Sequence, residues 1–140
     1  MTLLDPASRA WLAALADQLI PEDADMPAAS GVNVAEAGAD GVLAARPDLV
    51  EPLIAALTNT ASMDQPAHAV ELLRTQHPAL FGALTEVVAG AYYLHPEIQR
   101  RIGFHGRAAI SVERATVDAD LLAPVLERGS ICRPDPRGAF

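Results

Sequence analysis

Apolar residues recur along most of the chain at the three- and four-residue spacing of amphipathic helices, and prolines stand where the pattern breaks. Asp5 followed by Pro6 is typical of a helix start, and Pro21 ends the first run. The pattern therefore predicts a helix from residue 6 to about residue 19. Its apolar face consists of Trp11, Leu12, Leu15 and Leu19.

The same reasoning predicts further helices along the chain. They are expected at about residues 33–45 and 48–57, from residue 64 or 65, at 78–94, at 96–102 and at 118–128. The helix at 78–94 is apolar on most sides, so it should be the central one. Asn33 and Glu36 have the spacing of a capping box at the start of the second helix. The inner side of that helix is made of small residues, which predicts close approach of another helix.

These elements predict an all-α fold, a compact bundle of about five to seven helices. Residues 103–117 are expected to form a loop with a brief extended piece at 109–112. Residues 1–129 then form a single helical domain, and residues 130–140 an extended C-terminal tail that contains two prolines and one glycine.

Composition agrees with a helical core and narrows the choice of ligands. Hydrophobic residues make up 51% of the chain but only 4% is aromatic, so Ala, Leu and Val must fill the interior. The chain has no lysine, and residues 1–70 hold ten acidic residues against two arginines. Because phosphate binding needs a basic patch, nucleic acid is excluded as the expected partner.

Nothing in the chain predicts secretion or membrane insertion. Cys132 is the only cysteine, so no disulfide can form within the chain. The first residues do not have the pattern of an export signal, and no stretch approaches the ~20 apolar residues of a membrane span. We therefore expect a cytoplasmic protein without a membrane span.

No residue pattern predicts a complete active site. The serines lack the turn motif of an activated nucleophile, and the four histidines form no ligand pair within one helix. Acidic residues between 17 and 25 lack the spacing of a calcium loop, and no glycine-rich turn follows a strand. We expect no catalytic, cofactor-binding or metal-binding residues in this chain. The four histidines are His68, His77, His95 and His105.

Three segments carry a resemblance to a known family. They read Gly90-Ala-Tyr-Tyr-Leu-His-Pro96, Arg101-Ile-Gly-Phe-His-Gly106 and Leu121-Leu-Ala-Pro-Val-Leu-Glu-Arg-Gly129. In order and spacing they resemble the gluconate 2-dehydrogenase subunit 3 family, and Leu15-Ala-Asp-Gln-Leu-Ile-Pro21 is similar to the opening of that family. The likeness covers most of the chain, although the chain lacks the twin-arginine signal that many members carry.

The resemblance implies a non-catalytic accessory subunit of a flavin-dependent dehydrogenase or oxidase that acts on sugars, sugar acids or related alcohols. FAD and the catalytic histidine would belong to the large partner subunit, in a hetero-oligomer. The segment Tyr92 to Gly106 then becomes the expected contact surface. Adjacent tyrosines point about 100° apart on a helix, so Tyr92 is expected in the core and Tyr93 either outward or beneath the following loop. The expected interface residues are Tyr93, His95, Pro96, Phe104, His105 and Gly106.

An alternative reading makes the chain a stand-alone small enzyme or a small-ligand-binding protein. Its pocket would lie near residues 92–106, with Tyr93, His95 and His105 as the polar groups. A third possibility is a self-associating scaffold, suggested by the small-residue face of the second helix.

Overall fold

The computed structural model describes residues 4–106 and 119–129. The chain divides into two compact units, residues 1–106 and residues 107–140. We call the first unit the helical body. This unit ends at Gly106.

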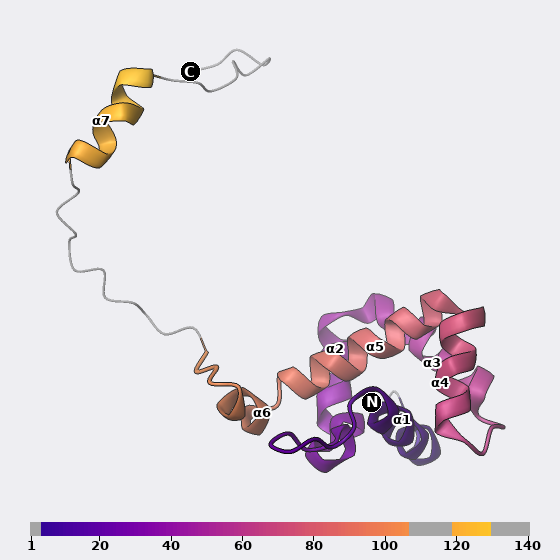
Figure 1. Ribbon diagram of the computed structural model, residues 1–140. Coiled ribbons are helices and arrows are strands. Elements are labelled where there is room, and N and C mark those ends of the chain that lie inside the picture. The colour runs from indigo at the N-terminus through magenta and orange to yellow at the C-terminus, as the bar shows by residue number, and fades with distance from the viewer. Residues whose placement is uncertain (1–3, 107–118, 130–140) are drawn as a thin grey trace, which may run out of the picture. The chain divides into compact units, whose positions relative to one another are not determined.

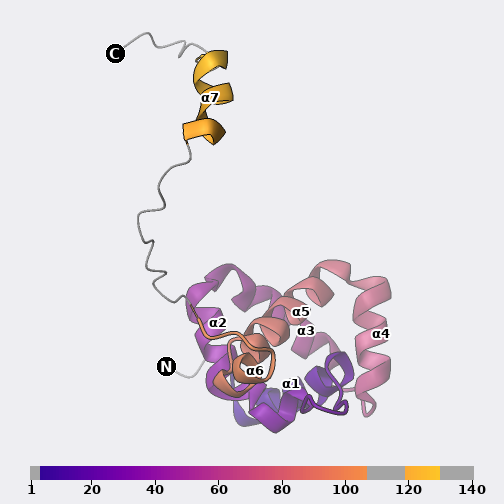
Figure 2. The same ribbon diagram turned by 60° about the vertical axis from the view of Figure 1, so that its left-hand side comes forward.

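The helical body consists of six α-helices joined by three short helical turns (Figures 1 and 2). In chain order these are α1 (Pro6–Leu19), the 3₁₀ turn η1 (Ala29–Val32), the π turn η2 (Val34–Gly38), α2 (Ala39–Ala45), the 3₁₀ turn η3 (Pro47–Leu49), α3 (Val50–Thr60), α4 (Pro66–Gln76), α5 (Pro78–Tyr93) and α6 (Pro96–Arg101). In the second unit the structure describes one helix, α7 (Ala119–Arg128). The described residues contain no β-sheet, so the prediction of an all-α fold is confirmed.

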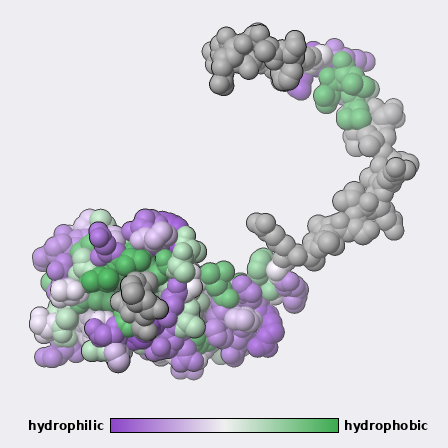
Figure 3. Space-filling view, turned by 180° about the vertical axis from the view of Figure 1, so that it is seen from behind, coloured by the Kyte–Doolittle hydropathy of each residue, from purple (hydrophilic) through white to green (hydrophobic). Residues whose placement is uncertain are grey.

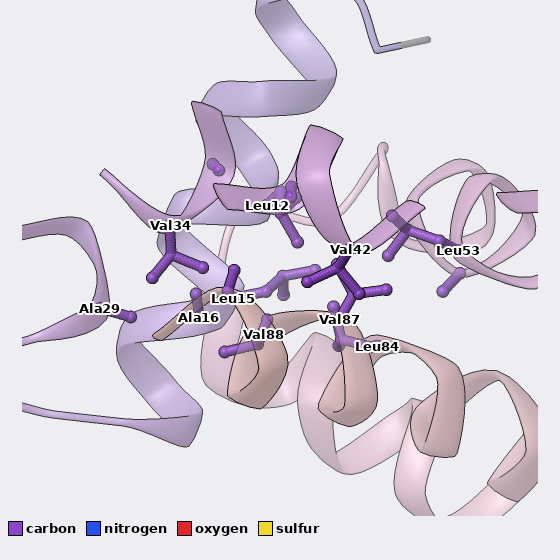
Figure 4. Packing of buried hydrophobic residues seen from close by; sticks show 14 of the residues in the cluster. Leu12, Leu15, Ala16, Ala29, Val34, Val42, Leu53, Leu84, Val87 and Val88 are labelled. Carbon is purple, nitrogen blue, oxygen red and sulfur yellow. The ribbon is translucent and has the colours of Figure 1, made fainter. Parts of the chain in front are cut away.

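Helix α5 is the central element of the body, as its apolar character predicted. It packs against α1, α2, α3, α4 and α6, and Figures 1 and 2 show it running between its neighbours. The core residues of α1, α2, α3 and α5 point toward one another in Figure 4. The largest fully buried side chains are Leu12, Leu15, Leu43, Leu53, Leu73, Leu84, Tyr92 and Ile98.

Small residues allow α5 to approach η2 and α2 closely. A methyl group placed on Gly38 would lie only 3.0 Å from the Cβ atom of Ala91, and one on Gly90 would lie 3.1 Å from Val42. Carbon atoms prefer separations of about 3.5–4.0 Å, so neither glycine leaves room for a side chain without movement. The close approach expected from the small-residue face is therefore present.

Two polar side chains of α1 fix it to other elements. Arg9 is buried, and its guanidinium donates to the backbone oxygen of Ala35 at 2.7 Å and to both carboxylate oxygens of Asp40 at 2.8 and 2.9 Å. The indole N–H of Trp11 donates to the hydroxyl oxygen of the fully buried Thr60 at 2.9 Å. Because buried polar groups are costly when unpaired, these bonds specify how α1 sits against η2, α2 and α3.

The start of the second predicted helix differs from expectation. Asn33 adopts a left-handed backbone conformation with φ of 54°, and its side chain makes no capping hydrogen bond. The backbone continues as the π turn η2, with non-helical angles at Glu36, before α2 begins at Ala39. The predicted capping box is therefore wrong. The Ala35 carbonyl bonds instead with Arg9 from α1, a contact that local spacing could not indicate.

Other local predictions hold or lie outside the described residues. Pro52 is the third residue of α3, in the first turn where proline is tolerated. Gly103 has a φ of 73°, as expected for the residue that ends a helix. The extended piece expected at 109–112, Cys132 and the expected tail at 130–140 lie outside the described residues.

Candidate functional site

The two adjacent tyrosines at the end of α5 have opposite environments. Tyr92 is buried, and its hydroxyl donates to the backbone oxygen of Pro27 at 2.7 Å. Tyr93 is 53% exposed, and its ring meets that of Tyr92 edge to face with the centroids 5.4 Å apart. The prediction that Tyr92 lies in the core is confirmed, and among the described residues Tyr93 is exposed. Burial raises the pKa of Tyr92 above its usual value.

The loop between α1 and η1 is held against this region by side chains from α5 and α6. Tyr92 binds it at Pro27, and the Arg101 guanidinium donates to the backbone oxygen of Asp25. The turn η1, which follows the loop, is tied back to α1 because Asp17 accepts the backbone N–H of Ser30 at 2.7 Å. The loop thereby supports the end of α5 and α6 from one side.

Helix α6 is short but well fixed at both ends. His95 is its N-cap residue, and the Nδ1 atom accepts the backbone N–H of Glu97 at 3.3 Å. Arg101 donates to Glu97 one turn earlier, at 2.7 and 3.1 Å, and this ion pair holds the pKa of Glu97 below its usual value. Pro96 is the first helical residue, where it gives up no needed donor. His95 and Pro96 therefore have a structural explanation as the start of α6.

The chain after α6 turns in a conformation that glycine permits. Gly103 and Gly106 have φ values of 73° and 78°, in the left-handed region. Between them the backbone N–H of Phe104 donates to the oxygen of Gln99 at 2.8 Å. Phe104 and His105 are exposed on this turn.

Four large apolar side chains are exposed within twelve consecutive residues, and we call this stretch the apolar segment 93–104. They are Tyr93, Leu94, Ile102 and Phe104, each between 51% and 65% exposed. Helix α6 rises only about 9 Å, so one partner surface could reach the residues before and after it. Because about half of each of these four side chains is exposed, together they present roughly 400 Å² of apolar surface.

Sequence reasoning found only part of this segment. Tyr93 and Phe104 were among the expected interface residues, whereas Leu94 and Ile102 appeared only as the last residues of two expected helices. Leu94 lies beyond the last residue of α5, so it no longer follows the buried stripe. The exposure of these two residues depends on where helices end, which periodicity indicates least well.

Shallow hollows flank the contact between α2 and α5. One, of about 290 Å³, is lined by Ala37, Gly38, Gly41, Val42, Ala91, Leu94, His95 and Pro96. It contains His95 from the pocket expected near residues 92–106, but Tyr93 and His105 are not among its lining residues. Its walls are mostly small apolar groups, which gives little basis for orienting a substrate.

The described residues show no arrangement with evident catalytic chemistry. None of their His, Asp or Glu side chains form a group of three that could hold a metal ion. His95 is engaged as a cap through Nδ1, and His68, His77 and His105 lie on different elements. No group in the segment 93–106 pairs a nucleophile with a base in the hydrogen bonds of the described residues.

None of the described helices is both long and apolar enough to cross a bilayer.

No family model, curated protein or solved structure matches this chain.

Proposed function

We propose that this chain is a non-catalytic accessory subunit of a flavin-dependent dehydrogenase or oxidase. The partner would be a large subunit that carries FAD and the catalytic histidine and acts on sugars, sugar acids or related alcohols. The small subunit stabilises that partner within a hetero-oligomer in the cytoplasm. Support comes from the three sequence segments that resemble the gluconate 2-dehydrogenase subunit 3 family, and from one feature of the surface.

That feature is the apolar segment 93–104, which supports the proposal most strongly. It exposes two aromatic and two aliphatic side chains in the stretch that carries most of the family likeness. Aromatic residues are enriched among those that contribute most of the binding energy at protein interfaces. The segment also has a firm base, because Ile98 and Tyr92 are buried beneath it and α6 is capped and ion-paired. A rigid base reduces the entropy lost when such a surface binds.

Co-expression with a large flavin-dependent dehydrogenase encoded next to this chain tests the proposal. We expect the two proteins to purify together in a fixed ratio, and the yield of soluble flavoprotein to fall when this chain is omitted. The proposal is contradicted if the two never purify together and the flavoprotein is fully soluble and active alone. Flavin absorbance should follow the large subunit, and the purified small chain should show none.

The alternative of a small-ligand-binding protein rests on the 290 Å³ hollow beside His95. It predicts that a ligand raises the melting temperature of the isolated chain and that His95→Ala removes the effect. Its support is weaker, because the hollow lacks the convergent polar groups that usually orient a small ligand.

A further inference from the structure

A hollow on the helical body lies apart from the apolar segment 93–104. Figure 3 shows one face of the body on which apolar side chains gather between hydrophilic ones, and small ligands bind in hollows that combine the two kinds of group. One such hollow, of about 340 Å³, lies between the first turns of α1 and the end of α3. Trp11 is its only aromatic lining residue among those described, and we call it the Trp11 hollow.

The Trp11 side chain is held in a fixed position beside this hollow. Its indole N–H donates to the hydroxyl oxygen of Thr60 at 2.9 Å, and that hydroxyl donates in turn to the backbone oxygen of Ala56 at 2.9 Å. Trp11 packs against the core but is only partly buried. Among aromatic side chains, the indole attracts a cation placed over its ring most strongly. The hollow therefore holds a positioned group that can bind a cation.

The charge around the hollow is negative. The Asp5 carboxylate lines it and accepts the backbone N–H of Ser8 at 2.8 Å, which lowers the pKa of Asp5 and keeps the group ionised at neutral pH. The positive end of the α1 dipole offsets about half of this charge. The end of α3, which has no basic residue in its last turn, restores about the same amount of negative charge. The described lining residues include no basic side chain, so a cation is favoured over an anion.

The apolar part of the lining selects among cations. Ala7, Leu57 and Ala61 contribute apolar groups to the hollow. A primary ammonium ion is strongly hydrated, so its placement against such groups is costly, whereas a quaternary ammonium ion is covered by its own methyl groups. We infer that the Trp11 hollow binds a free quaternary ammonium compound, with Trp11 in contact with its methyl groups and Asp5 as the opposite charge.

Fluorescence tests this inference directly, because Trp11 is the only tryptophan of the chain. The full-length protein is titrated with choline chloride, with sodium chloride at the same concentrations, and with the uncharged isostere of choline in which a carbon atom replaces the nitrogen. We expect a saturable change in Trp11 emission with choline only. The inference is overturned if choline causes no saturable change, or if sodium chloride or the uncharged alcohol causes an equal one.

The variant Asp5→Asn tests the opposite charge. Asparagine is also a good N-cap residue, so the start of α1 is kept. Choline should bind about fivefold more weakly to this variant, which is the upper end of what an exposed ion pair contributes. Glu51→Gln is the matched control, because it removes one exposed acidic charge at the other end of α3 and does not line the hollow. Equal affinity of Asp5→Asn and the unaltered chain would contradict the role of Asp5, and the comparison of choline with its isostere needs no variant.

Phosphocholine distinguishes a free cation from a lipid headgroup. It carries the same quaternary ammonium together with a phosphate, and the described lining of the hollow offers no basic side chain to pair with that phosphate. Phosphocholine should therefore bind more weakly than choline. Tighter binding of phosphocholine would overturn the assignment of the hollow to a free cation.

Discussion

The close contact between Gly38 and Ala91 predicts how the substitution Gly38→Ala changes the free energy of unfolding. In Gly38→Ala the new methyl group would lie 3.0 Å from the Cβ atom of Ala91 and 3.6 Å from its Cα and oxygen atoms. The Ala91 methyl is fixed to the backbone of α5 and cannot rotate away, so the helices must separate. Overpacking of this kind costs about 1–3 kcal/mol.

A second effect opposes this cost. Gly38 has right-handed helical backbone angles, so alanine fits its conformation and recovers about 0.5–1 kcal/mol of backbone entropy. The packing term is the larger, and we expect Gly38→Ala to lower the free energy of unfolding by about 1 kcal/mol.

Gly41→Ala is the matched control. Gly41 is exposed within α2, and a methyl group placed there meets no atom within 4 Å. This variant should therefore gain about 0.5–1 kcal/mol from helix propensity alone. Urea unfolding followed by circular dichroism measures both variants at equal protein concentration. If the two variants shift the free energy of unfolding equally in the same direction, α5 does not pack against η2 as closely as described.

Two further substitutions test the polar contacts of the body. Arg9→Leu should lower the free energy of unfolding by about 2 kcal/mol, because it leaves the buried Ala35 carbonyl without its charged donor. Urea denaturation measures this change, and an unchanged free energy of unfolding would contradict the role of Arg9. Tyr92→Phe should cost about 1 kcal/mol through loss of the bond to Pro27. The pKa of Tyr92 is raised in the folded protein, so its stabilising effect is complete below pH ~10, the unfolded value, and falls as the pH rises further. Tyr92→Phe has no hydroxyl to ionise, so it does not lose this contribution at high pH. The difference in free energy of unfolding between the unaltered protein and Tyr92→Phe should therefore shrink as the pH rises. A difference that stays the same at all pH values would count against burial of this hydroxyl.

Much of the helical body could be predicted because its signals are local. Prolines at residues 6, 66, 78 and 96 begin helices, and the apolar spacing of α5 identified its buried side. Burial of Tyr92 followed from its place on the apolar stripe, whereas the 100° rotation to Tyr93 left that residue either outward or beneath the following loop. These features need no knowledge of what lies elsewhere in the chain.

The remainder depends on contacts between distant residues. The π turn η2 bonds through its Ala35 carbonyl with Arg9, which is 26 residues earlier in the chain, and the predicted capping box took no account of this contact. The exposure of Leu94 and Ile102 depends on where the helices end and on which other residues cover these two side chains. Tyr93 and Phe104, named from the sequence as candidate interface residues, are exposed, and Leu94 and Ile102, which were not named, are exposed in the same stretch.

The proposed binding of a large flavoprotein subunit by the apolar segment 93–104 is tested best by a comparison of dissociation constants. The full-length variant Tyr93→Ala/Phe104→Ala removes both exposed aromatic rings, and Ile54→Ala truncates an exposed apolar side chain on α3 as the control. Interface aromatics often contribute 2 kcal/mol or more each, so the double variant should bind at least about thirtyfold more weakly than the unaltered chain, with the control unchanged. Equal dissociation constants for the double variant, the control and the unaltered chain would contradict the account.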